Sequence, residues 1–347
     1  MLKEMKKVSV IVPCFNAAEY LDKCIEYLLR QTMGLENMEI ILVNDASTDD
    51  GATWNVITGY ERKFPDTIMA VLLDQNMRQG GARNVGISYA RGEYLIFCDA
   101  DDWLLEETLA RCYSVAKEYD ADVVEFLIRN VQEHDLTVEL SRGDNSRLIE
   151  LDTDEKRREF LLCETQQCSF GSQKKMYKRS LIEDNHIRFA EHLIFEEPSF
   201  MLPVRLYEKR HYFLDELLYI CYLSPESTVR GEWGIHKWDN PKVWVHLMHD
   251  LEARGLLHDY HAELEYLFFA HGLGLSIRMA LQKGYWLTKE ELAFLTGLTL
   301  EMFPDIRKNR YIEQHKRIWY ELMLTLLTME ITEESTQTVN EILIKYL

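Results

Sequence analysis

Residues 94–102 read Tyr94-Leu-Ile-Phe-Cys98-Asp99-Ala-Asp101-Asp102, so five apolar or aromatic residues run directly into three carboxylates. The apolar run has the length of a buried strand, and the carboxylates follow where that strand ends. Three carboxylates so close together repel one another unless a cation or hydrogen-bond donors offset their charge. A hard divalent ion that prefers oxygen ligands, Mg²⁺ or Mn²⁺, is the natural partner. The competing interpretation is a helix N-terminus, with Asp102 capping a helix from Trp103 onward.

Upstream of this stretch, short β-branched runs alternate with segments of helical periodicity. We expect strands at residues 8–12, 39–43 and 68–73, and helices at residues 17–31 and 80–90 with a further one after residue 49. Such alternation is typical of βαβ units, so it predicts an α/β fold with a Rossmann-like mixed, mainly parallel sheet flanked by helices. Ligands of such sheets bind beyond the carboxyl ends of the strands. Three polar clusters fall at those ends, at residues 13–16, 44–49 and 99–102.

Composition excludes several classes of protein. The 347 residues include 39 Lys and Arg against 58 Asp and Glu, and a net charge of −19 argues against nucleic acid as a partner. The longest apolar run, at residues 266–277, is shorter than the roughly 20 residues of a membrane span. The N-terminus runs straight into a strand-like segment, so we expect no secretory signal. The seven cysteines match no metal or redox spacing and are expected to be reduced thiols of a cytoplasmic protein.

Beyond residue 110 the pattern changes twice. A strand-like run at residues 123–128 leads to a polar loop or hairpin at residues 132–147 and a helical segment at residues 154–163. From about residue 238 the pattern is helical and amphipathic to the end. We therefore expect a first domain at residues 1–225, built of halves 1–110 and 111–225, and a mainly helical C-terminal region at residues 226–347.

Three further segments contain candidate functional residues. Gln79-Gly-Gly-Ala-Arg83-Asn-Val-Gly86 opens a helix whose glycines would let a phosphate approach the backbone, although ordinary turn chemistry explains it equally well. Asn44-Asp45 ends a strand and could bind a nucleobase edge or form an Asx turn with a helix cap. Glu196-Glu197 follows an apolar run, where a carboxylate could act as a general base or simply begin a solvated helix.

These segments together resemble the family 2 glycosyltransferases. The resemblance rests on Val8-Ser-Val-Ile-Val-Pro-Cys-Phe-Asn16, on Val43-Asn-Asp-Ala-Ser-Thr-Asp49, on residues 79–86 and on the Asp-Ala-Asp-Asp run at residues 99–102. It is specific over about the first 110 residues and looser over residues 170–230. It implies the GT-A fold and an inverting, metal-dependent transfer of a hexosyl or N-acetylhexosaminyl group in polysaccharide biosynthesis. The donor would be a nucleotide-diphosphate sugar, UDP being the commonest nucleotide, and the acceptor a hydroxyl of a glycan or lipid-linked saccharide.

The resemblance also implies roles on the donor side. Pro13 and Phe15 would line the base pocket, with Phe15 against the ring face. Asp45 would accept a hydrogen bond from the base, and Arg83 would contact the base or the diphosphate. Asp99 would hold the ribose.

Metal binding and proton transfer would fall to other carboxylates. Asp101, as the second aspartate of the D-x-D motif, would bind Mn²⁺ or Mg²⁺. The family's usual acidic pair is Glu-Asp, whereas this chain has Glu196-Glu197, which displaces the second carboxylate by about one bond. Glu197 is the expected catalytic base, with Glu196 as the substitute. Residues 224–236 would form a lid, from which His236 could supply a further ligand.

Two other functions compete with this interpretation. A non-catalytic GT-A module that binds nucleotide sugar or a partner enzyme would be expected to lose Asp101 or Glu197, and both carboxylates are present. A nucleotidyltransferase would need a glycine-rich basic loop after the first strand, which Pro13-Cys-Phe-Asn16 does not provide. We therefore expect a cytoplasmic enzyme, located either in the cytoplasm at large or at the inner face of the membrane. The sequence does not decide whether the protein contacts the membrane peripherally or whether it forms a homodimer.

Overall fold

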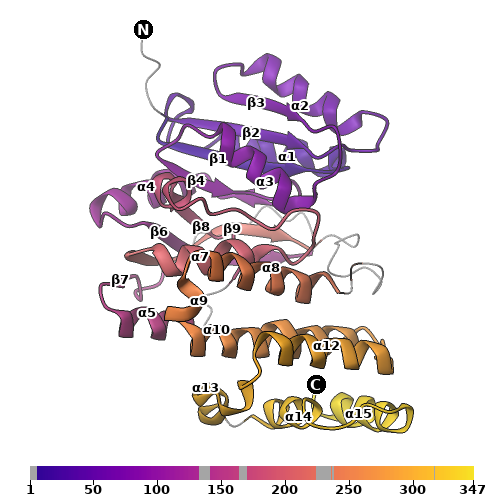
Figure 1. Ribbon diagram of the computed structural model, residues 1–347. Helices are drawn as coiled ribbons and strands as arrows, with labels where there is room; N and C mark the ends of the chain where they lie inside the picture. Colours follow the sequence, from indigo (N-terminus) through magenta and orange to yellow (C-terminus); the bar gives the residue numbers. More distant parts are fainter. Residues whose placement is uncertain (1–5, 133–140, 164–169, 224–235, 237, 316) are drawn as a thin grey trace. The chain divides into compact units, whose positions relative to one another are not determined.

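The computed structural model describes residues 6–132, 141–163, 170–223, 236, 238–315 and 317–347, which form two compact units (Figure 1). The first unit comprises Met1–His192 and Ser199–Val229, and the second comprises Leu193–Pro198 and Arg230–Leu347. The short segment 193–198 therefore belongs to the second unit, although the chain on both sides of it belongs to the first. The domain border predicted at residue 225 falls outside the described residues.

A nine-stranded sheet runs through the described part of the first unit. Its neighbours, in order, are β3 (Ile68–Leu72), β2 (Met38–Asn44), β1 (Val8–Cys14), β4 (Tyr94–Phe97), β8 (Lys175–Lys178), β6 (Val123–Val131), β9 (Arg210–Tyr222) and β5 (Trp103–Leu104), while β7 (Arg147–Glu150) pairs with β9. The strands β1 to β4 pair in parallel, whereas β8 is antiparallel to both of its neighbours. Strand β9 runs parallel to β6 and antiparallel to β5 and β7. The predicted mixed α/β class is confirmed, with the parallel pairing concentrated in the first hundred residues.

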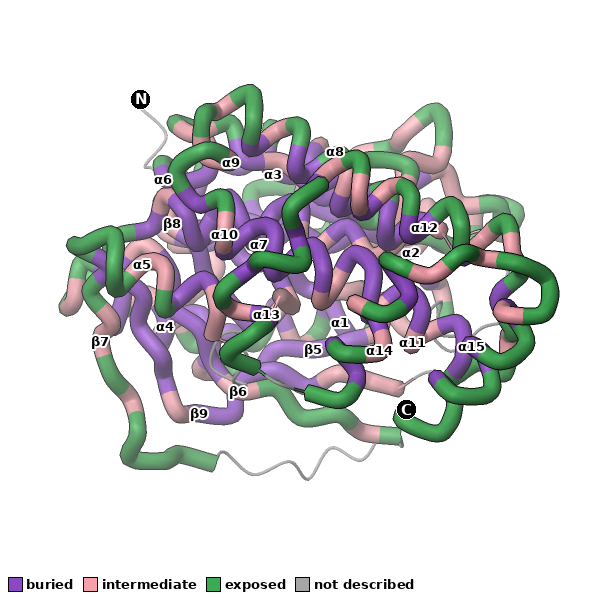
Figure 2. Tube along the Cα trace, turned by 60° about the horizontal axis from the view of Figure 1, so that its bottom comes forward, coloured by how far each residue is buried: buried purple, intermediate pink, exposed green. Residues whose placement is uncertain are grey.

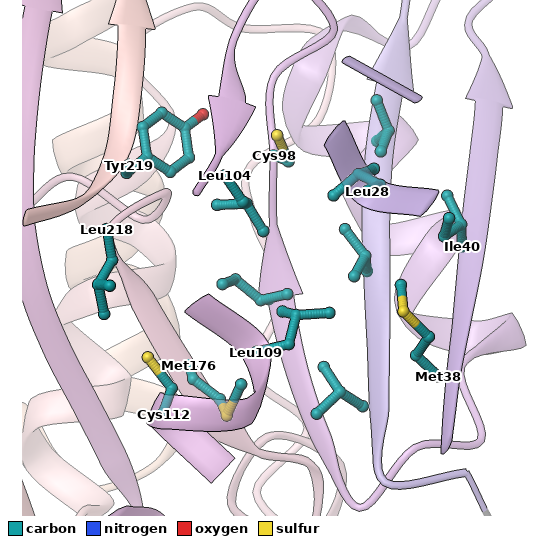
Figure 3. Packing of buried hydrophobic residues seen from close by; sticks show 14 of the residues in the cluster. Leu28, Met38, Ile40, Cys98, Leu104, Leu109, Cys112, Met176, Leu218 and Tyr219 are labelled. Carbon is teal, nitrogen blue, oxygen red and sulfur yellow. The ribbon is translucent and has the colours of Figure 1, made fainter. Parts of the chain in front are cut away.

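Helices cover both faces of this sheet. They are α1 (Ala18–Leu29), α2 (Ala52–Lys63), α3 (Arg78–Tyr89), α4 (Thr108–Glu118), α5 (Asp154–Leu161), α6 (Arg179–Asp184) and α7 (Glu197–Tyr207), with a 3₁₀ turn η1 (Leu35–Asn37) before β2. Along β1, Val10 packs in one core with Leu21 of α1, while Ile11 packs in the other core with Ile87 of α3. Burial on both faces explains why β1 and β2 are apolar without alternation. Figure 2 shows α7 buried along most of its length, and Figure 3 shows Cys98 and Tyr219 at the same end of the first core.

The second unit is helical, as predicted for the C-terminal region. After the 193–198 segment it contains α8 (Asp239–Ala253), α9 (Leu256–Asp259), α10 (His261–Leu267), the π-helix η3 (Phe268–Gly274), α11 (Leu275–Gln282), α12 (Lys289–Met302), the 3₁₀ turn η4 (Ile306–Lys308), α13 (Arg310–Gln314), α14 (Ile318–Leu326) and α15 (Glu333–Lys345). Capping boxes at Thr288 and Thr332 begin α12 and α15. Within the described part of the chain, every helix is too short or too polar to span a bilayer.

Candidate active site

The three carboxylates that follow β4 lie in one tight turn. The Asp102 N–H donates to the Asp99 carbonyl over 3.0 Å, so Ala100 and Asp101 are the central residues of a four-residue turn. Trp103 and Leu104 then form strand β5 against β9. The interpretation of Asp102 as a helix cap is therefore wrong, because the next helix, α4, begins only at Thr108.

Asp102 is held on both of its carboxylate oxygens. It is 3% exposed, the Tyr219 hydroxyl donates to its Oδ2 over 2.7 Å, and the Tyr222 N–H donates to its Oδ1 over 2.8 Å. Burial and the neighbouring Asp99 and Asp101 charges raise the pKa of Asp102 well above its ordinary value. This side chain fixes the turn onto strand β9 and has no oxygen left without a donor.

Asp99 is also held on both oxygens. Arg83, whose side chain is completely buried on α3, donates from Nη2 to Asp99 Oδ1 over 2.8 Å. Gln173 donates from Nε2 to Asp99 Oδ2 over 3.0 Å. Arg83 and Asp99, for which separate contacts with the donor were predicted, are thus in direct contact with each other.

Asp101 is bound differently from the other two carboxylates. Among the described residues, no hydrogen bond or ion pair joins the Asp101 carboxylate to another residue, and its pKa is raised to about 6 by burial and by the Asp99 charge. A carboxylate that is costly to ionise on its own is stabilised by a cation, and oxygen ligands suit Mg²⁺ and Mn²⁺. The described residues contain no cluster of three or more metal-ligating side chains. Such ions are held with few protein ligands when a substrate diphosphate completes the shell, so the donor set fits.

The ends of β1 and β2 are joined to each other. The Asn16 side chain donates to Thr48 Oγ1 over 3.2 Å and accepts from the Thr48 N–H over 2.8 Å. Asn16 has a φ of 49°, a left-handed conformation that asparagine tolerates. Its neighbour Phe15 is 44% exposed, which leaves the ring available to stack on a base, while Pro13 is buried within β1 beside Val43.

Asp45 directly follows β2 at this edge of the sheet and supports the loop that leads into α3. It is 3% exposed, and its Oδ1 accepts the Met77 N–H over 2.7 Å. Burial raises the pKa of Asp45, partly offset by the Met77 and Arg78 backbone donors. The preceding residue binds the same loop, because Asn44 Oδ1 accepts the N–H of Ser47, three residues further along the chain, over 3.0 Å.

Glu196 and Glu197 belong to the second unit and are described within it. Glu196 is 4% exposed, whereas Glu197 is partly exposed and forms the first turn of α7, where the helix dipole favours a negative charge. The Ile194 N–H lies 3.5 Å from Asp239 Oδ2, which also contacts His236 Nδ1 at 2.8 Å. Apart from His236, the predicted lid at residues 224–236 lies outside the described residues.

Two residues that contact the acidic turn were assigned no role there from the sequence. Gln173 precedes β8, 74 positions from Asp99, and Tyr219 lies in β9, 117 positions from Asp102. Both fall in the looser part of the family resemblance, at residues 170–230, and the stretch Tyr219-Ile-Cys-Tyr222 resembles the acceptor-side half of the family. The contact with the acidic turn arises from the folding of the sheet, which the sequence does not show.

The buried thiols lie beneath the same turn. Cys24 Sγ and Cys98 Sγ are 3.9 Å apart, and Cys24 Sγ is 3.7 Å from the Asp99 carbonyl. None of the six described cysteines forms a disulfide bond in this structure. Cys168 lies outside the described residues.

Comparison with known proteins gives both relatives and a shared fold. Residues 9–184 match the family described as "Glycosyl transferase family 2". The poly(ribitol-phosphate) beta-glucosyltransferase of Bacillus spizizenii is 27% identical over 234 residues, which are 64% of this chain and 35% of that protein. Glycosyltransferase GlyG of Streptococcus pneumoniae is 29% identical over 283 residues, which are 75% of this chain and 89% of that one. The match thus spans about a third of the length of the first of these relatives.

A solved structure with the same fold is S. aureus TarS 1–349 in complex with UDP-GlcNAc. It aligns with a TM-score of 0.68 at 20% identity, covering 96% of this chain and 90% of that one. At this identity the likeness shows the shared fold alone.

Proposed function

The chain belongs to glycosyl transferase family 2, because residues 9–184, half of its sequence, match this family, and we propose that it transfers a hexosyl or N-acetylhexosaminyl group from a UDP-sugar to an acceptor hydroxyl with inversion at the anomeric carbon. The observation that carries the proposal is the acidic turn after β4. Asp99 and Asp102 have a donor from another residue on every carboxylate oxygen, whereas no other described residue donates a hydrogen bond to the Asp101 carboxylate. One carboxylate is therefore left for a cation and the diphosphate that accompanies it.

On the donor side, each residue has a distinct task. In this proposal Phe15 stacks on the base beside Pro13, and Asp45 accepts a hydrogen bond from the base. Asp99, oriented by Arg83, holds the ribose. Asp101 would hold Mn²⁺ or Mg²⁺, which when bound neutralises the charge that develops on the departing diphosphate.

On the acceptor side, a carboxylate accepts the proton of the attacking hydroxyl. We assign this role to Glu197, with Glu196 as the alternative. Attack from the face opposite the diphosphate inverts the anomeric carbon in one displacement. Residues 1–225 would form the catalytic domain, with donor and acceptor halves at 1–110 and 111–225, and residues 226–347 a helical appendage.

The acceptor we infer is a surface glycan, a lipid-linked saccharide or a polyol-phosphate polymer. The name of the Bacillus spizizenii relative supports the last of these. The free cysteines suit a reducing compartment, so we place the reaction in the cytoplasm, at the inner face of the membrane if the acceptor is lipid-linked.

Thermal unfolding with UDP, GDP, dTDP and their sugars, each with and without Mn²⁺, tests the donor site. We expect UDP compounds to raise the melting temperature only with metal, and Asp101→Ala to abolish the rise. A ligand at 100 times its Kd stabilises by about 2.7 kcal/mol, which such a scan resolves. Transfer to a glycan or poly(ribitol-phosphate) acceptor, with the anomeric product identified by NMR, tests the reaction. Binding without hydrolysis or transfer would favour the non-catalytic module instead, and no response to any nucleotide would refute the donor site.

A further inference from the structure

The acidic turn is tied to a distant strand through a single hydroxyl group. Tyr219 Oη accepts the Asp99 N–H over 3.1 Å and donates to Asp102 Oδ2 over 2.7 Å. The hydroxyl therefore accepts a hydrogen bond at the first residue of the four-residue turn and donates one to the last residue. The two ends cannot move apart without breaking one of these bonds.

The strand that carries Tyr219 is itself fixed. Tyr219 is opposite Leu104 of β5 and Ile128 of β6, and the Leu105 N–H donates to the Leu218 carbonyl over 3.0 Å. Tyr219 is completely buried, so water cannot readily replace its hydroxyl. Its ring lies at the edge of the core drawn in Figure 3, at the same end as Cys98, the residue before Asp99.

We call the Tyr219 hydroxyl, with its bonds to Asp99 and Asp102, the tether of the turn. It gives the three carboxylates different roles. Tyr219 and Tyr222 occupy the oxygens of Asp102, and Arg83 and Gln173 occupy those of Asp99 (Tyr222 N–H, 2.8 Å; Arg83 Nη2, 2.8 Å; Gln173 Nε2, 3.0 Å). Asp101 alone remains at the centre of the turn. Without the hydroxyl, Asp102 Oδ2 would lose its donor, and a buried carboxylate without a donor would compete for a nearby cation.

We infer that Tyr219 is a positioning residue, which holds the turn in the shape that presents Asp101 to a divalent cation. This inference rests on the proposed function, because it concerns the cation of that donor site. Residues one step removed from a metal commonly change its affinity by about 10- to 100-fold when mutated. Tyr219 acts through the turn rather than on Asp101 itself, so we expect a change of about tenfold, at the lower end of that range.

The test compares Tyr219→Phe with Tyr94→Phe. Tyr94 is a matched control, since it is also buried in the sheet and donates one hydrogen bond, to the Ala121 carbonyl over 3.3 Å, away from the turn. Calorimetric binding of UDP is measured across a Mn²⁺ titration. We expect the half-saturating Mn²⁺ concentration to rise about tenfold in Tyr219→Phe and to stay within twofold of wild type in Tyr94→Phe.

A second measurement needs neither metal nor nucleotide. Hydrogen exchange of the Asp99 amide reports directly on its bond to the Tyr219 hydroxyl. We expect faster exchange there in Tyr219→Phe and unchanged exchange in Tyr94→Phe. If Tyr219→Phe does not fold, Asp102→Asn tests the same tether, because its amide cannot accept from both Tyr219 and Tyr222, and it should raise the Mn²⁺ requirement in the same direction.

The two inferences fail in different ways. If wild-type protein binds UDP with Mn²⁺ and Tyr219→Phe has the same Mn²⁺ requirement, the role of Tyr219 is refuted and the donor site stands. If wild-type protein shows no Mn²⁺-dependent nucleotide binding, the proposed function itself fails. If the half-saturating Mn²⁺ concentration rises equally in both tyrosine variants, Tyr219 acts only as a core residue and has no specific role at the turn.

Discussion

A buried cluster of charges beside β8 predicts that the stability of the first unit falls as pH rises above neutrality. His211 Nδ1 is 3.0 Å from Glu208 Oε2, and His211 Nε2 is 3.4 Å from Glu125 Oε2. Lys174 and Lys175 approach Glu125 at 3.0 and 3.4 Å. Burial alone would lower the pKa of His211, but the two glutamates more than offset it and raise that pKa to about 9.

The size of the effect follows from linkage. A raised histidine pKa stabilises the fold fully below the ordinary value of 6.5, and the stabilisation is lost as pH rises through about 9. Between pH 6.5 and pH 8 this loss is on the order of 1–2 kcal/mol for one group whose pKa is raised to about 9. Burial lowers the pKa of Lys175 to about 8, so this lysine deprotonates more easily in the folded state, which offsets a small part of the loss over the same range. The net change is therefore a loss of stability on the order of 1 kcal/mol. The Arg205 guanidinium also faces Lys175 and helps to lower the pKa of that lysine.

Urea unfolding at pH 6.5, 7.2 and 8.0, read by hydrogen exchange of peptides from β6 and β9, measures this unit separately from the other. In His211→Gln the decline with pH should disappear, leaving the small gain from Lys175. His258→Gln, at an exposed position on α9, is the control and should keep the wild-type decline. Equal slopes in wild type and His211→Gln would mean that His211 is neutral in the folded protein, and the electrostatic reasoning would be wrong.

Three further predictions concern packing, the donor site and proton transfer. A Cβ at Gly86 would overlap Ile11 Cγ2, so Gly86→Ala should lower the free energy of unfolding by about 1–3 kcal/mol. Ile11→Ala should relieve the clash, so the two substitutions together should cost less than the sum of their separate effects. Strictly additive effects in this double-mutant cycle would contradict the prediction. Arg83→Met leaves a largely buried carboxylate without its cation and should cost about 3 kcal/mol in urea unfolding, whereas a near-neutral result would show that this ion pair does not hold the turn. Glu197→Gln should lower kcat by about 10²- to 10⁴-fold while the Kd of the donor stays within twofold; an undiminished kcat would move the base to another residue.

The first half of the fold was predictable because its information is local. In β1 and β2, continuous apolar runs mark strands buried on both faces, and the segments between them have helical periodicity. Each βαβ unit then has one favoured handedness. The position of the acidic turn follows from the end of β4, whereas Arg83 lies within α3, and the structure brings Arg83 and Asp99 into contact.

The second half was less predictable because its pairings are distant in sequence. Strand β9 has thirteen residues and pairs with β5, β6 and β7. The sequence of β9 alone does not predict which strands pair with it. For the same reason no role at the acidic turn could be predicted for Gln173 or Tyr219, although both contact Asp99. The short strand Trp103–Leu104 exists only because β9 lies beside it, which is why a helix cap at Asp102 was a reasonable but wrong expectation.

The long separation between the acidic turn and its tether also has a consequence for synthesis of the chain. Asp99 is made 120 residues before Tyr219, which at bacterial or eukaryotic elongation rates of about 5–20 residues per second is a delay of roughly 6–24 s. During that interval the nascent chain holds three carboxylates within four residues and the unpaired edge of β4, whose partner β8 is also still to come. Nucleotide binding by the emerging chain is expected only after β9 has left the ribosome, so the last strand of the sheet sets the earliest moment at which the donor site can mature.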